Sequence, residues 1–332
     1  MHAYQVIEFG SPSTLRIHEV ADLKPSEGQI LVDVAAAGIN FPDALVVSGR
    51  YQTMPDRPFV PGKELAGVVR AVGTRVSGFT PGDRVLCQVE YGAFAEQALV
   101  RPEQTFRLPD GLALSGAAAM GLVYQTAFIA MRDRAGLRDG ETILVGGAAG
   151  GVGVAAIQLA KALGARVLAA VRKPEQAELV RSAGADAVID VGGPNLREVL
   201  RAQVHVATDG HGADVVLDPV GGEFFGAALR ALAWSGRLVV IGFAGGEIPS
   251  VKANYLLVKN ISVSGLQWSD YRDRLPERVA EVQARIFDFW HSGSLQPFVT
   301  KTFAFEELPH ALELIERGGI RGKAVLLVNG KH

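Results

Sequence analysis

The sequence predicts an α/β protein that joins a β-rich part to a doubly wound parallel sheet. Up to about residue 120, short β-type runs are interrupted by glycine and proline. From about residue 122 to residue 266, strand-like runs instead alternate with helix-like runs, which is typical of a parallel sheet with helices on both faces. At roughly 150 residues per domain, the length of 332 residues allows one domain for each part.

The β-rich part opens the chain. Its strand-like runs, bounded by turn-forming residues, cover 17–20, 29–39, 64–73, 82–89 and 93–100. After residue 266 a helix-like stretch spans 276–293. The chain ends on a strand-like run at 322–330, which could return to the sheet of the first part.

The alternating part has an apolar strand-like run at each expected position. These runs cover 141–147, 166–171, 186–191, 214–222, 237–243 and 261–265. Helix-like runs at 154–164 and 174–184 follow the first two strands. Because ligands bind such sheets at the carboxyl ends of the strands, candidate binding residues are sought there.

Composition limits the classes of partner. Lys+Arg number 33 and Asp+Glu 35, so the net charge is −2, without the basic excess that nucleic acid or an anionic membrane would attract. The single cysteine, Cys87, cannot form an intramolecular disulfide, which favours a reducing compartment. No signal-peptide pattern and no run of roughly 20 apolar residues is present. We therefore expect a cytoplasmic protein with a small-molecule substrate.

A glycine-rich turn follows the first strand of the alternating part. It has the form of G-x-G-x-x-G, with Ala148 in place of the first glycine. Such a turn lets the backbone approach a pyrophosphate, and the following helix N-terminus offers free N–H donors. The cofactor contacts predicted here are Ala149, Gly150, Gly151, Val152 and Gly153. The alternative is a plain strand-to-helix turn.

The residues after the second strand indicate which dinucleotide binds. An Asp or Glu at this point, about 20 residues after the glycine motif, would bind the ribose 2′-OH of NAD. This chain has Arg172 and Lys173, and their cationic groups suit the 2′-phosphate of NADP. We therefore expect NADPH as the cofactor. The alternative, a pair of solvated charges, is kept open by the nearby Glu175.

Two further glycine-rich turns follow apolar strands, DPVGG at 218–222 and GFAGG at 242–246. Both fall at carboxyl strand ends, and the second is the better candidate for lining a nicotinamide site. Ordinary turn chemistry is the alternative for each. The cofactor contacts predicted from this region are Val220, Phe243, Gly245 and Leu266.

Segments spread over nearly the whole chain carry a family resemblance. They are AAGINFPDALVVSGRY (36–51), PFVPGKELAGVVRAVGTRVSGFTPGDRV (58–85), GGAAGGVG (146–153), DPVGG (218–222), LLVKNISVSG (256–265) and RGKAVLLV (321–328). In this order they resemble the medium-chain dehydrogenase/reductase superfamily, and within it the zinc-independent quinone oxidoreductase family.

The resemblance implies two domains and a dimer. Residues 1–121 and 267–332 would form a GroES-like catalytic domain, and residues 122–266 a Rossmann nucleotide-binding domain. A homodimer would form by edge pairing of the nucleotide-binding domains, with ISVSG (261–265) as the expected edge.

The resemblance also bears on metal content. Zinc-containing members carry their ligands at the positions of Asn40, Lys63 and Leu122. An amide, an ammonium and an aliphatic side chain cannot replace thiolates and imidazole around Zn²⁺. The seven histidines show no ligand spacing either. We therefore expect no metal.

Without Zn²⁺, alcohol oxidation lacks its Lewis acid. A quinone or another conjugated carbonyl accepts hydride with only orientation and hydrogen-bond donors. By resemblance, Asn40, Tyr51 and Tyr124 would line the substrate cleft, and Asn40 and Thr126 would contact the cofactor. Structural alternatives exist for all: Asn40 could hold its own turn, and the tyrosines could pack in the core.

Two lysines have open roles. Lys63 could form an ion pair with Glu64, which we favour, or stabilise a developing oxyanion. Lys323 is a candidate additional partner of the 2′-phosphate, because Gln176 and Val191 stand where relatives keep a phosphate-contacting lysine and tyrosine.

Together these observations predict a zinc-independent, NADPH-dependent oxidoreductase that transfers hydride to a quinone. One alternative is reduction of the C=C bond of enones or 2-enoyl thioesters. A second alternative is an NADPH-binding protein with little turnover.

Overall fold

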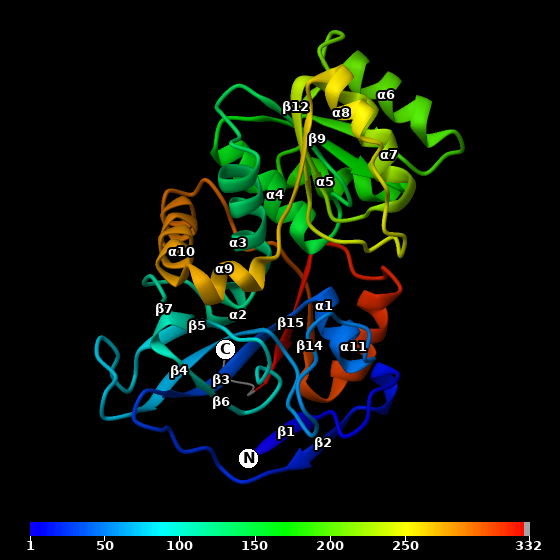
Figure 1. Ribbon diagram of the computed structural model, residues 1–332. Coiled ribbons are helices and arrows are strands. Elements are labelled where there is room, and N and C mark those ends of the chain that lie inside the picture. Colours follow the sequence, from blue (N-terminus) through cyan, green and yellow to red (C-terminus); the bar gives the residue numbers. More distant parts are fainter. Residues whose placement is uncertain (329–332) are drawn as a thin grey trace. The chain divides into compact units, whose positions relative to one another are not determined.

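The computed structural model describes residues 1–328 (Figure 1), so residues 329–332, which end the predicted range 267–332, lie outside it. The chain divides into two compact units. Among the described residues, unit 1 comprises Met1–Leu122, Ser269–His291 and 297–328, and unit 2 comprises Val123–Trp268 and Ser292–Gln296. The short segment Ser292–Gln296 thus belongs to unit 2, whereas the sequence analysis placed it in the β-rich domain.

Unit 2 contains a six-stranded sheet of order β10-β9-β8-β11-β12-β13, in which all neighbours are parallel. Its strands are β8 Thr142–Val145, β9 Arg166–Val171, β10 Ala187–Asp190, β11 Ala213–Asp218, β12 Leu232–Val240 and β13 Ser262–Gly265. The predicted parallel sheet is confirmed, and the carboxyl ends of its strands lie along one edge.

Helices cover both faces of this sheet (Figure 1). α4 Gly151–Ala162 and α5 Ala177–Ser182 follow β8 and β9, and lead outward to β10. α6 Leu196–Ala207 and α7 Gly222–Ala231 lead in the opposite direction, to β11 and β12. Because parallel crossovers are right-handed, the two pairs lie on opposite faces.

Two further helices belong to this part of the chain, α3 Leu122–Ile129 and α8 Ala253–Lys259. The central strands are buried on both faces, so their apolar runs are nearly continuous. Leu144, Val216 and Leu238 of the sheet pack with Phe224 and Phe225 of α7 in one core.

Unit 1 contains a larger, mainly antiparallel sheet. Its order is β14-β15-β3-β4-β5-β7, and β6 also pairs with β3. The strands are β3 Ile30–Ile39, β4 Glu64–Val72, β5 Arg84–Gln88, β6 Gln97–Val100, β7 Thr105–Arg107, β14 Val299–Ala304 and β15 Lys323–Leu327. The late strand β15 runs antiparallel to β3, with Ala324 opposite Ile39, which confirms the predicted return to the first sheet.

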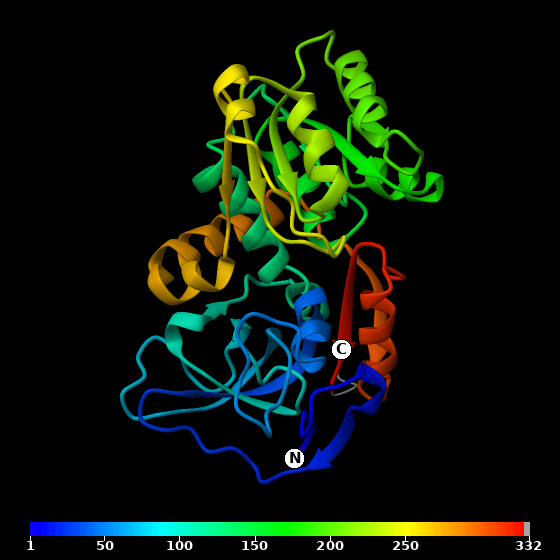
Figure 2. The ribbon, with the colours of Figure 1, turned by 45° about the vertical axis from the view of Figure 1, so that its right-hand side comes forward.

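The remaining elements of unit 1 surround this sheet. Figure 2 shows the orange-red helix α11, Leu308–Glu316, beside the late strands β14 and β15. Its Leu308 and Leu312 belong to the same core as Leu326 of β15. The helices are α1 Phe41–Val47, α2 Leu114–Ala117, α9 Trp268–Arg274, α10 Pro276–His291 and α11 Leu308–Glu316, and a small sheet pairs β1 His2–Gln5 with β2 Arg16–Glu19.

No helix within residues 1–328 combines the length and the apolar character needed to cross a membrane.

Candidate functional site

The glycine turn of unit 2 links β8 to α4, as the sequence predicts. Gly147 adopts a positive φ of 54°, and its carbonyl accepts a hydrogen bond from Gly150 N at 2.9 Å. Gly151, Val152 and Gly153 then open α4, where the first amides have no carbonyl partner one turn earlier. These free N–H donors, at the positive end of the helix dipole, suit a pyrophosphate.

Close packing explains why glycine is needed at two of these positions. A Cβ on Gly153 would lie 2.4 Å from Gly147 O, and a Cβ on Gly146 would lie 2.5 Å from Phe224 Cε1. Ala148 is tolerated in place of the first motif glycine because Gly147, one residue earlier, takes the positive φ. The residue with the positive φ is therefore Gly147, one position before Ala148, which occupies the first glycine position of the motif.

The two predicted phosphate-binding cations lie directly after β9. The backbone N–H groups of Arg172 and Lys173 donate to Gln176 Oε1 at 3.0 and 3.1 Å, so Gln176 shapes this turn. Both cationic side chains are exposed, and within the described part of the chain neither has an ion-pair or hydrogen-bond partner. Both are therefore available to a phosphate.

Asp218 at the end of β11 shapes the DPVGG turn. Its Oδ1 accepts hydrogen bonds from Val220 N at 2.8 Å and Gly221 N at 2.9 Å. Burial raises the pKa of this carboxyl, against the lowering effect of the two backbone donors. Gly221 has a φ of 73°, and a Cβ there would lie 2.8 Å from Glu247 O, so the turn requires glycine.

The structure brings the other predicted cofactor contacts of unit 2 together. Gly245 N donates to Val220 O at 2.8 Å, and the Phe243 ring would contact a Cβ on Gly221 at 3.0 Å. Leu266 N donates to Val240 O at 3.0 Å, which places Leu266 beside the end of β12. The cofactor residues predicted on β8, β9, β11, β12 and β13 thus share one edge of the sheet.

Two predicted site residues lie on α3. Tyr124 is 1% exposed, and its hydroxyl donates to Gln158 Oε1 of α4 at 2.7 Å. The core thus uses the polar atom of Tyr124, as in the structural alternative, and its substrate contact stays a prediction. Thr126 is also buried, and its cofactor contact stays a prediction.

Unit 1 holds a buried carboxylate that the sequence analysis did not assign to the site. Glu64 is 0% exposed. Its Oε1 accepts from Asn40 Nδ2 at 2.9 Å and Lys323 Nζ at 2.5 Å, and its Oε2 accepts from Leu122 N at 2.8 Å and Gln88 Nε2 at 3.3 Å. The available signal was a single acidic residue at the start of the apolar run ELAGVV.

This arrangement involves two residues with predicted cofactor roles, Asn40 and Lys323. The Asn40 amide donates to Gly38 O at 3.2 Å and to Glu64, and its Oδ1 accepts from Lys323 Nζ at 2.5 Å. Lys323 uses its third donor on Ile39 O at 3.1 Å and is 4% exposed. Neither side chain retains a donor for substrate or cofactor. The contacts favour the structural alternative for Asn40 and make Lys323 the counter-ion of Glu64, and the cofactor contacts of both residues stay predictions.

Lys63 is paired differently from the prediction. Its Nζ donates to the Glu90 carboxylate and, at 3.2 Å, to Glu90 O, and it lies 4.7 Å from the centroid of the Tyr51 ring. Glu90 Oε2 also accepts from Arg272 Nη1 at 2.9 Å. The predicted pair with Glu64 is wrong, because Lys63 pairs with Glu90 and the Glu64 carboxylate pairs with Lys323.

Tyr51 is the predicted substrate residue whose ring stays partly exposed. Burial raises the pKa of its hydroxyl, and the Glu90 and Asp43 carboxylates add to the shift, while Ser269 and Arg272 oppose it. A phenol is already protonated near neutral pH, and the direction of this shift favours the same form, which can donate a hydrogen bond.

Asp43 lies in the first turn of α1 and is buried. Its Oδ2 accepts from Asn40 N at 2.7 Å, and its Oδ1 has no hydrogen-bond partner among residues 1–328. Burial raises the pKa of this carboxyl to about 7, although the Lys63 charge and the Asn40 N–H lower it. Asp43 is thus a buried acid that titrates near neutrality.

The positions at which the resemblance implies zinc ligands carry Asn40, Lys63 and Leu122, and these side chains are not a zinc donor set. Residues 1–328 contain no group of three or more His, Cys, Asp or Glu that could hold a metal ion.

Two family models match the chain. Residues 26–110 match the alcohol dehydrogenase GroES-like domain, and residues 151–284 match the family described as zinc-binding dehydrogenase. The matched ranges fall in unit 1 and largely in unit 2, respectively.

Curated proteins and solved structures are similar over nearly the full chain. A quinone oxidoreductase-like protein 2 homolog of Nematostella vectensis is 38% identical over 90% of this chain and 81% of that protein. The structure of Escherichia coli quinone oxidoreductase complexed with NADPH has a TM-score of 0.91 and 29% identity, covering 99% of this chain and 100% of that one. The CurK enoyl reductase structure has a TM-score of 0.88 and 25% identity, covering 99% of each chain.

Proposed function

Because the chain belongs to the quinone oxidoreductase family of the medium-chain dehydrogenase/reductase superfamily, we propose that this oxidoreductase transfers hydride from NADPH to a quinone. The observation that carries the proposal is the edge of the unit 2 sheet. Free helix amides and two cations without a partner in the described part of the chain follow neighbouring strands there. The similar structure of Escherichia coli quinone oxidoreductase is a complex with NADPH, which supports NADPH as the cofactor of this chain.

Residues of unit 2 would hold the cofactor. The amides of Gly151, Val152 and Gly153 suit the pyrophosphate, and Arg172 with Lys173 suits the 2′-phosphate. Ala149, Gly150, Thr126, Val220, Phe243, Gly245 and Leu266 complete the proposed cofactor contacts. When bound, NADPH supplies the hydride.

We propose that the reaction proceeds without zinc. The family description of one matched model names zinc, but an amide, an ammonium and an aliphatic side chain cannot coordinate it. A quinone needs no Lewis acid to accept hydride, because the resulting anion is delocalised over its conjugated oxygens. Orientation and a hydrogen-bond donor are sufficient.

Tyr51 is the proposed donor to the acceptor oxygen. Its hydroxyl is kept protonated by burial and by nearby carboxylates, and Lys63 fixes the ring from one face. The Glu90–Arg272 pair holds Lys63 in turn. A protonated phenol placed in this way can stabilise the developing oxyanion of a reduced quinone.

A second activity is favoured by one specific comparison. The CurK enoyl reductase shares the fold over 99% of both chains, so reduction of the C=C bond of an enone or a 2-enoyl thioester remains the alternative. Both acceptors require the same hydride and the same oxyanion stabilisation. A protein that binds NADPH with little turnover is the second alternative.

A homodimer is part of the proposal. β13 pairs with β12 and has no second neighbour in the sheet as described. Trp234, Leu257 and Val258 expose more than three quarters of their surface (77%, 78% and 76%). An open strand edge with large apolar side chains nearby suits a second copy of the chain. Sedimentation should give a dimer, and Leu257→Arg should weaken it.

The cellular location proposed is the cytoplasm. The thiol of Cys87 is fully buried, and burial raises its pKa to about 12, so it is an unreactive core group that needs no disulfide partner.

The test compares NADPH oxidation with a quinone, an enone and an enoyl thioester, each in the presence of a chelator. We expect the fastest turnover with the quinone. Turnover with the conjugated carbonyls alone would assign the enzyme to C=C reduction. NADPH binding without turnover of any acceptor would contradict both activities.

A further inference from the structure

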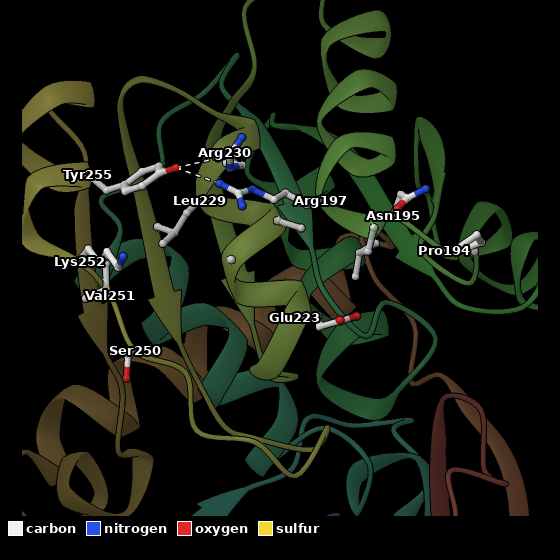
Figure 3. Close-up of a pocket in the computed structure, with 14 residues that line it drawn as sticks. Pro194, Asn195, Arg197, Glu223, Leu229, Arg230, Ser250, Val251, Lys252 and Tyr255 are labelled. Carbon is white, nitrogen blue, oxygen red and sulfur yellow. Dashed lines mark hydrogen bonds between the residues drawn. The ribbon is translucent and has the colours of Figure 1, made fainter.

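Unit 2 contains a pocket of about 550 Å³ that the proposed function does not use (Figure 3). Three segments line it: residues 193–197 at the start of α6, one side of α7, and residues 250–255, which lead into α8. Neither the glycine turn nor the cations after β9 are among the lining residues. The pocket is therefore a separate feature of this unit.

Cations outnumber carboxylates in the lining. The lining contains three cationic residues, Arg197, Arg230 and Lys252, and one carboxylate, that of Glu223. Within residues 1–328, the side chains of Arg197 and Lys252 have no carboxylate partner, and Arg230 has only Glu198 at 3.5 Å. Glu198 is 66% exposed, so this ion pair neutralises little of the charge. The pocket is positively charged.

One phenol oxygen holds two of the cations. Tyr255 Oη accepts from Arg230 Nη2 at 2.8 Å and from Arg197 Nη2 at 3.2 Å, as the dashed lines of Figure 3 show. Two guanidinium groups at one neutral oxygen repel each other, and a bound anion would relieve that repulsion. Planar guanidinium groups match the paired oxygens of a phosphate.

Gly226 keeps the wall of the pocket open. It lies inside α7, has no positive φ, and a Cβ at this position would meet no atom within 4 Å. Glycine in a helix interior is destabilising relative to alanine, and nothing in the local packing requires it. Beside it, Ala227, Leu229 and Val251 supply apolar surface. The pocket thus has room for an organic body next to its charged end.

We propose that this pocket binds an organic phosphate monoester. The phosphate would pair with Arg197 and Arg230, and the organic part would lie along Gly226 and Val251. Two guanidinium groups held by a shared hydroxyl form a preorganised phosphate site, and the apolar wall adds selectivity for an ester over the free ion. The proposal does not depend on the proposed function, because binding here needs neither hydride transfer nor an acceptor.

The test is a calorimetric titration of the full chain with phenyl phosphate, with and without saturating NADPH. We expect binding under both conditions, weaker binding of inorganic phosphate, and none of phenol. Arg197→Gln should weaken phenyl phosphate binding at least tenfold. Arg181→Gln, an exposed arginine on α5 outside the pocket, is the matched control and should leave it unchanged.

A second variant separates binding from folding. Gly226→Ala should raise the melting temperature, because it improves the helix without a clash, while Gly226→Leu should fill the pocket and abolish phenyl phosphate binding. The proposal fails if phenyl phosphate gives no binding, if Arg197→Gln binds as the unchanged protein does, or if NADPH displaces the probe. None of these results bears on quinone reduction, which is measured separately.

Discussion

Lys323 and Glu64 form a buried ion pair that ties β15 to β4 within unit 1. The ammonium lies 2.5 Å from Glu64 Oε1, and the two side chains are 4% and 0% exposed. The same ammonium reaches Asn40 and Ile39, and the same carboxylate accepts from Leu122 N. One buried charge pair therefore connects β15 and β4 with the residues around Asn40 and Leu122.

Replacing Lys323 should lower the free energy of unfolding far more than replacing an exposed lysine. Lys323→Met leaves Glu64 as an uncompensated buried carboxylate, so we expect the free energy of unfolding to fall by about 3–5 kcal/mol. Urea denaturation measures this loss. Lys24→Met, at an exposed position, is the control. An equally small loss in both variants would show that the pair contributes nothing to stability.

Asp43 should make the protein less stable as pH rises. Burial raises the pKa of this carboxyl from 3.8 to about 7, so the folded state binds a proton that the unfolded state has already released. The protonated carboxyl therefore contributes fully to the free energy of unfolding below about pH 4. This contribution is lost progressively as the pH rises to about 7, and the total loss is at most about 4 kcal/mol. Denaturation midpoints across this range should decline less steeply in Asp43→Asn. If the denaturation midpoint changes with pH equally in both proteins, Asp43 is not the group that causes the change.

The charge pair after β9 should set the cofactor preference. Arg172→Gln with Lys173→Gln removes two charge-assisted contacts, each worth about 1.5–3 kcal/mol, or roughly a ten- to hundredfold effect. We expect the KM for NADPH to rise by at least tenfold and the KM for NADH to stay nearly constant. Arg181→Gln is again the matched control. A parallel rise in both KM values would contradict the 2′-phosphate contact.

The two tyrosines of the predicted cleft should behave differently. Tyr124→Phe leaves the buried Gln158 Oε1 without its donor, so it should cost about 1–3 kcal/mol of stability with kcat nearly unchanged. Tyr51→Phe removes the proposed donor to the acceptor oxygen and should lower kcat by roughly tenfold or more with little loss of stability. Steady-state kinetics and thermal melts on both variants provide the comparison, and a large loss of kcat in Tyr124→Phe alone would reverse these roles.

The sequence predicted those features that depend on local pattern. The alternation of apolar runs with helix-like runs gave the parallel sheet, since buried central strands such as Thr142–Val145 are apolar throughout. The glycine turn was predictable because its conformation depends on a few adjacent residues. Even there, the positive φ belongs to Gly147 rather than to the first motif position.

Features that depend on distant contacts could not be predicted in this way. Lys323 and Glu64 are 259 residues apart, and no periodicity indicates that they meet. Asn40 has the residue type of a ligand contact, but the buried carboxylate of Glu64 uses its amide. Lys63 and Glu64 are adjacent in sequence and still have different partners, Glu90 and Lys323. Side-chain direction, rather than residue type, decided these roles.

The most direct test of metal-free hydride transfer is the deuterium isotope effect on quinone-dependent oxidation of NADPH. The protein is first treated with a chelator, and its zinc content is measured. We expect full activity without zinc and slower oxidation when deuterium replaces the transferred hydrogen of NADPH. Activity that is lost with the chelator and restored by Zn²⁺ would contradict metal-free hydride transfer.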